Sequence, residues 1–216
     1  MDKGQQVLDA ESFFELAHVS RETMDRLSVY ESLLRKWQGS INLVSKSTLE
    51  DVWRRHFLDS TQLLDLSSDR HLKWADFGSG AGFPGLVLAI LARDRVGFQM
   101  NLVESDQRKS VFLREVIRET GAPAVVHTSR IESPETIAAI GTCDALSARA
   151  CAPLDRLMGW AEPYFGPETE AFFLKGAQAD EELTVARKSW TFRVTSYRSQ
   201  ADPDGCVLKV EQLARV

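Results

Sequence analysis

The sequence predicts an α/β fold: a seven-stranded sheet whose last strand is antiparallel, preceded by a helical N-terminal extension. From Leu72 onward, apolar strand-like runs alternate with helical runs, which is typical of parallel strands joined by right-handed crossovers. The last two strand-like runs then follow each other with only a turn between them, which favours a closing hairpin. A glycine-rich stretch directly after the first strand indicates where a ligand would bind.

The N-terminal part, from about residue 9 to 66, reads as helices. Apolar residues at a spacing of about 3.6 predict one helix that ends at Gly39: Leu27, Tyr30, Leu34 and Trp37. The segment Thr48–Asp51 resembles a capping box and predicts the start of another helix. We therefore expect residues 1–70 to form a helical extension packed on a larger domain, residues 71–216.

The larger domain contains the alternating elements. The expected strands are Lys73–Phe77, Phe98–Glu104, Ala122–Thr128, Cys143–Arg149, Glu170–Lys175, Trp190–Arg198 and Cys206–Leu213. The expected helices are Pro84–Arg93, Gln107–Glu119, Pro134–Ile140, Leu154–Tyr164 and Ala179–Ser189. Asp202-Pro-Asp-Gly205 supplies turn residues between the last two strands. Five parallel strands followed by a hairpin resemble the sheet of class I (Rossmann-like) methyltransferases, whereas a symmetric dinucleotide fold would more often continue strand–helix.

Composition excludes several classes of protein. No apolar run approaches the ~20 residues that span a bilayer, and the N-terminus lacks the pattern of a secretory signal. Three cysteines without metal or disulfide spacing, and four histidines with none paired at i, i+4, argue against a metal site. The net charge of −5 argues against a sequence-blind nucleic-acid coat protein. We expect a monomeric cytoplasmic protein with neither a metal nor a membrane partner.

The glycine-rich stretch supports two interpretations. Gly80, Gly82 and Gly85 satisfy the dinucleotide pattern, and Glu104 follows at the spacing of its ribose-binding acid. However, Asp76 stands just before the glycines, where a carboxylate would repel a pyrophosphate. The same carboxylate would favour S-adenosylmethionine, which carries a sulfonium and an ammonium. The motif Asp76-Phe-Gly-Ser-Gly-Ala-Gly82 is similar to the first motif of class I methyltransferases.

The remaining candidates follow other strands, because ligands of open α/β sheets lie beyond the carboxyl ends of the strands. Ile131-Glu132 stands where an adenine ring would be flanked, and Arg149 follows the fourth strand at the expected mouth of the pocket. Cys151 has two interpretations: a thiol nucleophile for C5-pyrimidine methylation, or a structural cysteine. We favour the second, since its neighbours are alanines and no second motif cysteine is present.

Several motifs together carry a more specific resemblance. They are Asn42-Leu43, Arg55-His-Phe-Leu-Asp-Ser60, Asp76-Phe-Gly-Ser-Gly-Ala-Gly-Phe-Pro-Gly85, Ser129-Arg-Ile-Glu132, Ser147-Ala-Arg-Ala150 and Leu174-Lys-Gly176. With these motifs in this order, the chain resembles the ribosomal RNA small-subunit methyltransferase G family, also called glucose-inhibited division protein B. The resemblance covers roughly residues 30 to 210.

The resemblance implies S-adenosylmethionine as cofactor and methylation of guanine N7 in the 530 loop of bacterial 16S rRNA, as free rRNA, the small subunit or its precursor. Carried over by position, it implies cofactor contacts at Gly78, Phe83, Ile131, Glu132 and Arg149, beside the pattern-derived Asp76, Gly80 and Glu104. It also implies RNA-facing roles for Arg54, Arg55, His56 and Lys175. A dinucleotide-dependent oxidoreductase, a C5-pyrimidine methyltransferase acting through Cys151 and a non-catalytic RNA-binding module remain as alternatives.

Guanine N7 has a free lone pair and no proton to lose, so its methylation needs no general base. The lack of an evident histidine–carboxylate pair near the strand ends agrees with that reaction, and we therefore assign no catalytic residue. Basic residues cluster in three places: Arg54-Arg55, then Arg108, Lys109, Arg114 and Arg118, and then Arg187, Lys188 and Arg193. A cluster that borders the pocket would supply phosphate contacts for RNA.

Overall fold

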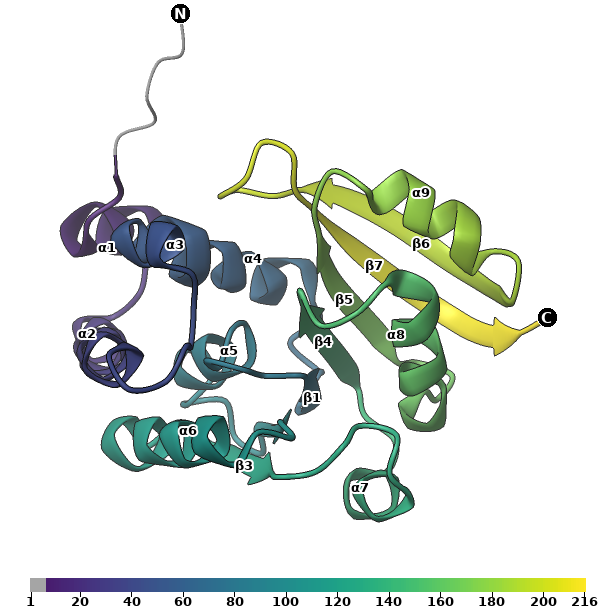
Figure 1. Cartoon of the computed structure of the whole chain (residues 1–216), viewed down its shortest axis with the longest axis horizontal. Helices are drawn as coiled ribbons and strands as arrows, with labels where there is room; N and C mark the ends of the chain where they lie inside the picture. The colour runs from purple at the N-terminus through teal and green to yellow at the C-terminus, as the bar shows by residue number, and fades with distance from the viewer. Residues whose placement is uncertain (1–6) are drawn as a thin grey trace, which may run out of the picture.

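The computed structural model describes residues 7–216 and shows one seven-stranded sheet flanked by helices (Figure 1). The strand order is β3-β2-β1-β4-β5-β7-β6. The strands are β1 Lys73–Phe77, β2 Gln99–Val103, β3 Ala124–His127, β4 Ala145–Arg149, β5 Glu170–Lys175, β6 Trp190–Arg198 and β7 Cys206–Arg215. Strands β1 to β5 pair in parallel, and β7 lies antiparallel between β5 and β6. This arrangement confirms the predicted sheet with its antiparallel last strand.

Helices cover both faces of the sheet. One face carries α5 Gly85–Leu91 and α6 Gln107–Thr120, together with the N-terminal helices α1 Ala10–Ala17, α2 Arg21–Gln38, α3 Lys46–Glu50 and α4 Asp59–Leu66. The opposite face carries α7 Pro134–Ile140, α8 Leu154–Ala161, the short η2 Glu162–Tyr164 and α9 Ala179–Ala186. In Figure 1 the sheet separates these two groups. None of the described helices is both long and apolar enough to cross a membrane.

The side-chain alternation of β1 shows why the sheet has two cores. Trp74 is fully buried among the N-terminal helices and α5, while Ala75 and Phe77 belong to the cluster under α8. Successive residues of a strand point to opposite faces, so a strand covered on both sides is apolar almost throughout. Asp76 lies on the Trp74 face and is the exception in this strand, fully buried beside the start of α5.

The N-terminal helices share a continuous apolar cluster with this face of the sheet. Tyr30 and Leu34 of α2 are fully buried there, as is Phe57 of the next helical segment. The predicted helix end at Gly39 is confirmed, because Gly39 is the C-cap of α2. The division at residue 70 stays a prediction, since the two parts form one packed layer here.

The start of α3 differs from our expectation. We predicted that Thr48 opens this helix, but Ser45 is the N-cap and its Oγ accepts the Thr48 N–H at 3.2 Å. The Thr48 hydroxyl instead donates back to the Ser45 carbonyl at 3.1 Å. Serine and threonine are both favoured at the N-cap of a helix. Ser45 is the N-cap of α3 because its side chain lies over the first free N–H groups.

Between α3 and α4 the chain forms a π-helical segment, η1 Trp53–Leu58. Its hydrogen bonds include one from the Asp59 N–H to the Arg54 carbonyl, five residues back. π-helical turns are rare in proteins, and those that do occur are frequently found at functional sites. Here the segment carries Arg55 and His56 to the carboxyl edge of the sheet.

Candidate functional site

The loop between β1 and α5 is the floor of the site. Gly78 has φ +62° and Gly82 has φ +95°, a left-handed region that side chains rarely adopt. A Cβ on Gly78 would clash with the thiol of Cys151, which follows β4. The Tyr30 hydroxyl donates to the Ala81 carbonyl from the opposite side. The loop is therefore held in place from β4 and from α2 at once.

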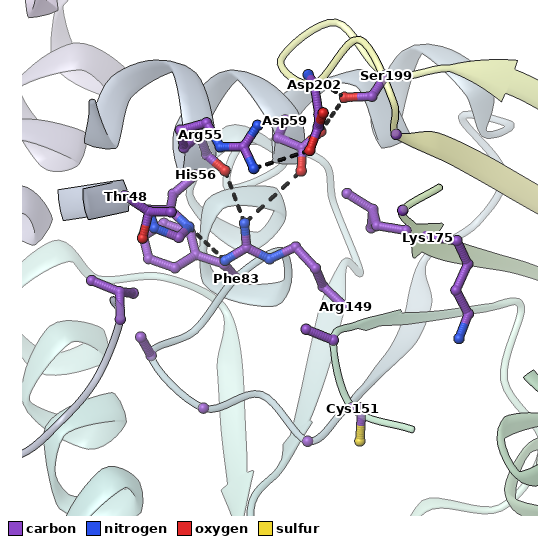
Figure 2. A pocket seen from close by; sticks show the side chains of 18 of the residues that line it. Thr48, Arg55, His56, Asp59, Phe83, Arg149, Cys151, Lys175, Ser199 and Asp202 are labelled. Atoms are coloured by element: carbon purple, nitrogen blue, oxygen red, sulfur yellow. Dashed lines mark hydrogen bonds and ion pairs between the residues drawn. The ribbon is translucent and has the colours of Figure 1, made fainter. Parts of the chain in front are cut away.

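A cavity of about 650 Å³ lies above this loop, at the carboxyl ends of β1, β4 and β5 (Figure 2). Its volume is in the range of small-molecule sites. The floor and one side come from the glycine loop and the residues after β4 and β5: Gly78 to Ala81, Phe83, Arg149 to Pro153 and Leu174 to Gly176. The other walls come from the segment around α3, from η1 and α4, and from the loop between β6 and β7.

Two buried acidic side chains, Asp76 and Glu104, lie beneath the glycine loop. Asp76 Oδ1 accepts the Ser147 hydroxyl at 2.7 Å, and its buried Oδ2 lies against the backbone of Gly85 at the start of α5. Burial raises the pKa of Asp76 to about 6. Glu104 accepts the Gly80 N–H at 2.8 Å through Oε2 and the Asp106 N–H at 2.7 Å through Oε1. Glu104 thus holds the glycine loop, at the edge of the cavity rather than in its lining.

Arg149 lies at the cavity wall, as its position after β4 predicted, and its guanidinium is paired. Nη1 donates to the Arg55 carbonyl at 2.9 Å, and Nη2 donates to His56 Nδ1 at 2.6 Å. Asp59 Oδ2 lies 3.9 Å from Nη1. In Figure 2 the side chain reaches away from Cys151 toward these residues of η1 and α4. Burial lowers the pKa of Arg149, with Asp59 opposing the shift.

Phe83 lies beneath this network in a stack of aromatic rings. Its ring centroid is 5.1 Å from that of Tyr30 and 4.7 Å from that of His56, with interplanar angles of 18° and 24°. The Arg149 guanidinium carbon is 5.2 Å from the Phe83 centroid. A cation over an aromatic face is stabilised by the ring quadrupole. The stack therefore sets the distance between the Arg149 guanidinium and the glycine loop.

The loop between β6 and β7 completes the wall. The Ser199 hydroxyl donates to Asp59 Oδ1 at 2.8 Å, and Asp202 Oδ2 lies 3.0 Å from Nη2 of Arg55 (Figure 2). Our sequence reasoning gave no role to Asp59 or Ser199 and expected Asp202 only as a turn residue between the last two strands. Asp59 stood within the motif Arg55–Ser60 and could have been singled out there. The two loop residues carried no signal for a place in the site, because only the hairpin geometry brings Ser199 to Asp59 of α4 and Asp202 to Arg55 of η1.

The residues expected to face RNA have different surroundings. Lys175 Nζ donates to the Ala152 carbonyl and to Glu182 Oε2, both at 2.7 Å, and lies in the cavity lining. Arg54 lies outside that lining, with Nε 3.6 Å from Asp51. His56 lines the cavity but is only 6% exposed, so its ring is largely covered rather than open to solvent. Of the basic clusters, Arg54-Arg55 borders the cavity through Arg55, and the one on α6 borders it through Lys109.

Ile131 and Glu132 follow β3 and lie outside the cavity lining. Ile131 is 7% exposed, and its carbonyl accepts the Tyr164 hydroxyl at 2.6 Å. Glu132 is exposed, 3.9 Å from Nη1 of Arg130. The two residues stand at the same sheet edge as the glycine loop, and their contact with an adenine ring stays a prediction.

Cys151 is half-buried in the lining, and burial raises the pKa of its thiol to about 11. The nucleophilic form of cysteine is the thiolate, so a protonated thiol disfavours the C5-pyrimidine mechanism. Within residues 7–216, no group of three or more His, Cys, Asp or Glu side chains is arranged to hold a metal ion.

Comparison with solved structures shows the fold. A TehB-like methyltransferase dependent on S-adenosylmethionine, from Corynebacterium glutamicum, superposes with a TM-score of 0.54 at 14% identity, covering 86% of this chain and 98% of that chain. A mutant of MtNAS in complex with S-adenosylmethionine gives a TM-score of 0.55 at 17% identity, covering 96% and 85%. At this identity the likeness concerns the class I methyltransferase architecture alone.

Sequence comparison is more specific. The ribosomal RNA small subunit methyltransferase G of Parvibaculum lavamentivorans is 62% identical over 210 residues, which cover 97% of this chain and 92% of the relative. The protein of the same name from Rhodospirillum centenum is 53% identical over 196 residues, covering 91% and 87%. The family model for rRNA small subunit methyltransferase G matches residues 23–203. The chain therefore belongs to the rRNA small subunit methyltransferase G family.

Proposed function

We propose that this protein transfers the methyl group of S-adenosylmethionine to N7 of a guanine in the 530 loop of 16S rRNA, in the cytoplasm. Membership of a methyltransferase family and the class I methyltransferase fold support S-adenosylmethionine as the methyl donor. The names of the relatives support small-subunit rRNA as substrate. The observation that supports the choice of N7 is a cavity whose titratable side chains, within residues 7–216, offer no free proton acceptor.

The residues present fit the cofactor. The fully buried carboxyl of Asp76 lies behind the glycine loop, outside the cavity lining, where its charge would favour a cationic ligand in the cavity. The proposed cofactor contacts are Gly78, Gly80 and Phe83 of this loop, Arg149, and the acids and apolar residue after β2 and β3, Glu104, Ile131 and Glu132. When bound, S-adenosylmethionine supplies an electrophilic methyl group on a sulfonium sulfur.

The acceptors around the cavity are all engaged. Burial and the neighbouring Arg149 lower the pKa of His56 to about 2, and its Nδ1 already accepts from Arg149. Asp59 accepts from Ser199, and Glu182 accepts from Lys175. Transfer to guanine N7 removes no proton, so a pocket without a base is suited to it. The chain then contributes alignment, which is worth ~10⁵–10⁸ M in effective concentration, or about 7–11 kcal/mol.

RNA would approach over the open side of the cavity. Lys109 lies in the lining, and the described residues provide no ion pair within 4.0 Å of its amino group. Arg55 and Lys175 also line the cavity, and Arg54 precedes Arg55 on η1. These cations would contact phosphates, which set the position of an RNA without reading its sequence. N7 must be presented from a loop or by a flipped nucleotide.

The alternatives predict different ligands. A dinucleotide oxidoreductase disagrees with the family to which the chain belongs, and a symmetric dinucleotide sheet would lack the antiparallel β7. Calorimetric titration separates the cases: we expect binding of S-adenosylhomocysteine and no binding of NADH. Binding of neither ligand would favour a non-catalytic RNA-binding module.

The decisive experiment is nucleoside mass spectrometry of 16S rRNA from a strain that lacks this gene. We expect one 7-methylguanosine to be missing from the 530 loop and to return with the wild-type gene. Gly78→Asp and Arg149→Ala should fail to restore it, while Gly39→Ala, remote from the cavity, should restore it. An unchanged 16S rRNA profile, with a methyl group missing from tRNA or protein instead, would refute the proposed substrate.

A further inference from the structure

His56 was expected to face RNA, but its surroundings suit another role. The ring is 6% exposed and stacks on Phe83. Its Nδ1 lies 2.6 Å from Nη2 of Arg149. A guanidinium can only donate, so Nδ1 must be the acceptor and the ring proton must be on Nε2. The contact therefore selects one neutral tautomer of the ring.

The rest of the histidine makes no competing contact. Nε2 is buried and has no hydrogen-bond partner among the described residues. A second proton on the ring would place two cations against each other in a buried site. Burial and Arg149 accordingly lower the pKa of His56 to about 2, so the ring remains an acceptor at any pH at which the protein works.

We propose that His56 is a positioning residue that fixes the guanidinium of Arg149 at the cavity wall and thereby sets the affinity for the cofactor. This inference rests on the proposed contact between Arg149 and S-adenosylmethionine. Three features of the geometry support it: His56 Nδ1 and the Arg55 carbonyl hold the two Nη groups, and Phe83 lies beneath both side chains. Two acceptors from one helical segment define the plane of the guanidinium.

Other roles for His56 agree less well with the structure. A general base needs a free lone pair, and the one on Nδ1 is occupied. A phosphate contact needs an exposed N–H, and Nε2 is buried. If the ring of His56 only filled space in the core, no acceptor would be needed at the position of Nδ1. A variant that keeps an acceptor there therefore distinguishes packing from the positioning of Arg149.

The test compares His56→Asn with His56→Leu. Both variants lose the ring and its stack on Phe83, but Asn keeps an acceptor oxygen on the same γ carbon that carries Nδ1. We expect His56→Leu to weaken binding of S-adenosylhomocysteine about tenfold or more, as for the loss of a hydrogen bond to a charged group. His56→Asn should stay within about threefold of the wild type. Equal affinities for the two variants would overturn the proposal.

A double-mutant cycle locates the effect. If His56 acts through Arg149, His56→Leu should change the affinity of the Arg149→Ala protein by less than about threefold. A full additional loss in that background would show an independent structural role and refute the proposal. Unchanged binding by Arg149→Ala alone would refute it as well, since nothing would then be gained by positioning this side chain.

The controls separate affinity from folding. His71 is 8% exposed, with Nδ1 3.7 Å from Glu170 Oε2, and is a buried histidine outside the cavity lining. His71→Leu and His71→Asn should leave the affinity unchanged, whatever they do to the midpoint of urea unfolding. Because the titration contains no RNA, its outcome is independent of whether the methylated base is the proposed guanine.

Discussion

Replacing Gly78 by alanine tests whether the glycine loop between β1 and α5 has room for one additional methyl group. The substitution adds one methyl group at a residue with φ +62°, and that methyl would clash with Sγ of Cys151 and lie 3.3 Å from its Cβ. Two separate costs follow from this geometry. The left-handed backbone costs a residue with a Cβ roughly 1–2 kcal/mol, and overpacking costs about 1–3 kcal/mol.

We therefore expect Gly78→Ala to lower the free energy of unfolding by about 2–5 kcal/mol, or to move Cys151 into the cavity and weaken ligand binding instead. Cys151→Ala removes the sulfur but not the Cβ. In the Cys151→Ala background, Gly78→Ala should therefore cost less, by about the overpacking share of 1–3 kcal/mol. The cost of the left-handed backbone, roughly 1–2 kcal/mol, should be the same with and without the Cys151→Ala substitution.

Urea denaturation and calorimetric titration with S-adenosylhomocysteine measure the two effects. Gly39→Ala is the matched control, because Gly39 has φ −66° and an added Cβ would lie 3.8 Å from the Lys36 carbonyl oxygen, at ordinary van der Waals distance. That variant should be neutral or gain about 0.4–1 kcal/mol. If Gly78→Ala matched the wild type in both stability and affinity, the loop would be looser than its geometry implies.

Three further predictions concern single side chains near the cavity. Cys151→Ser should retain methyl transfer, since a thiol with a pKa of about 11 is protonated at neutral pH; loss of transfer with binding intact, or a trapped covalent RNA adduct, would contradict this. Tyr30→Phe leaves the buried Ala81 carbonyl without its donor and should lower the free energy of unfolding by about 1–3 kcal/mol in urea; a wild-type value would contradict the contact. Asp76 has a folded pKa of about 6 against an ordinary value of 3.8, so the folded state holds the proton between these values and stability falls as pH rises through that window. Relative to Asp76→Asn, the wild type should lose about 2 kcal/mol between pH 4 and 6, and parallel pH profiles would refute the assignment.

Much of the fold was predictable because the strands carry their own pattern. The bounds of β1, β5 and β6 agree with the apolar runs Lys73–Phe77, Glu170–Lys175 and Trp190–Arg198. The end of β7 was predicted at Leu213, whereas the strand runs to Arg215, which pairs with Trp190 of β6. A partner strand extends the ladder beyond the apolar pattern, and pairing of that kind is not visible in a single segment.

The site was predictable only where one stretch of sequence builds it. The glycine loop with Asp76 is local, and its motif indicated the ligand class. The network around Arg149 is not local, because its partners come from η1, from α4 and from the β6–β7 loop. The burial of His56 was missed for the same reason: an exposed and a buried histidine look alike until the packing of η1 against Phe83 is known.

The wall of the cavity joins segments that are made at very different times during synthesis. Asp59 meets Ser199 across 140 residues of chain, and Arg55 meets the Ala201 carbonyl across 146. Contacts this distant in sequence form slowly, because a long loop must close before they contribute. On the ribosome, α4 emerges long before the hairpin that completes its surroundings. A growing chain therefore has no finished pocket until the hairpin is released, and the enzyme becomes competent late in its own synthesis.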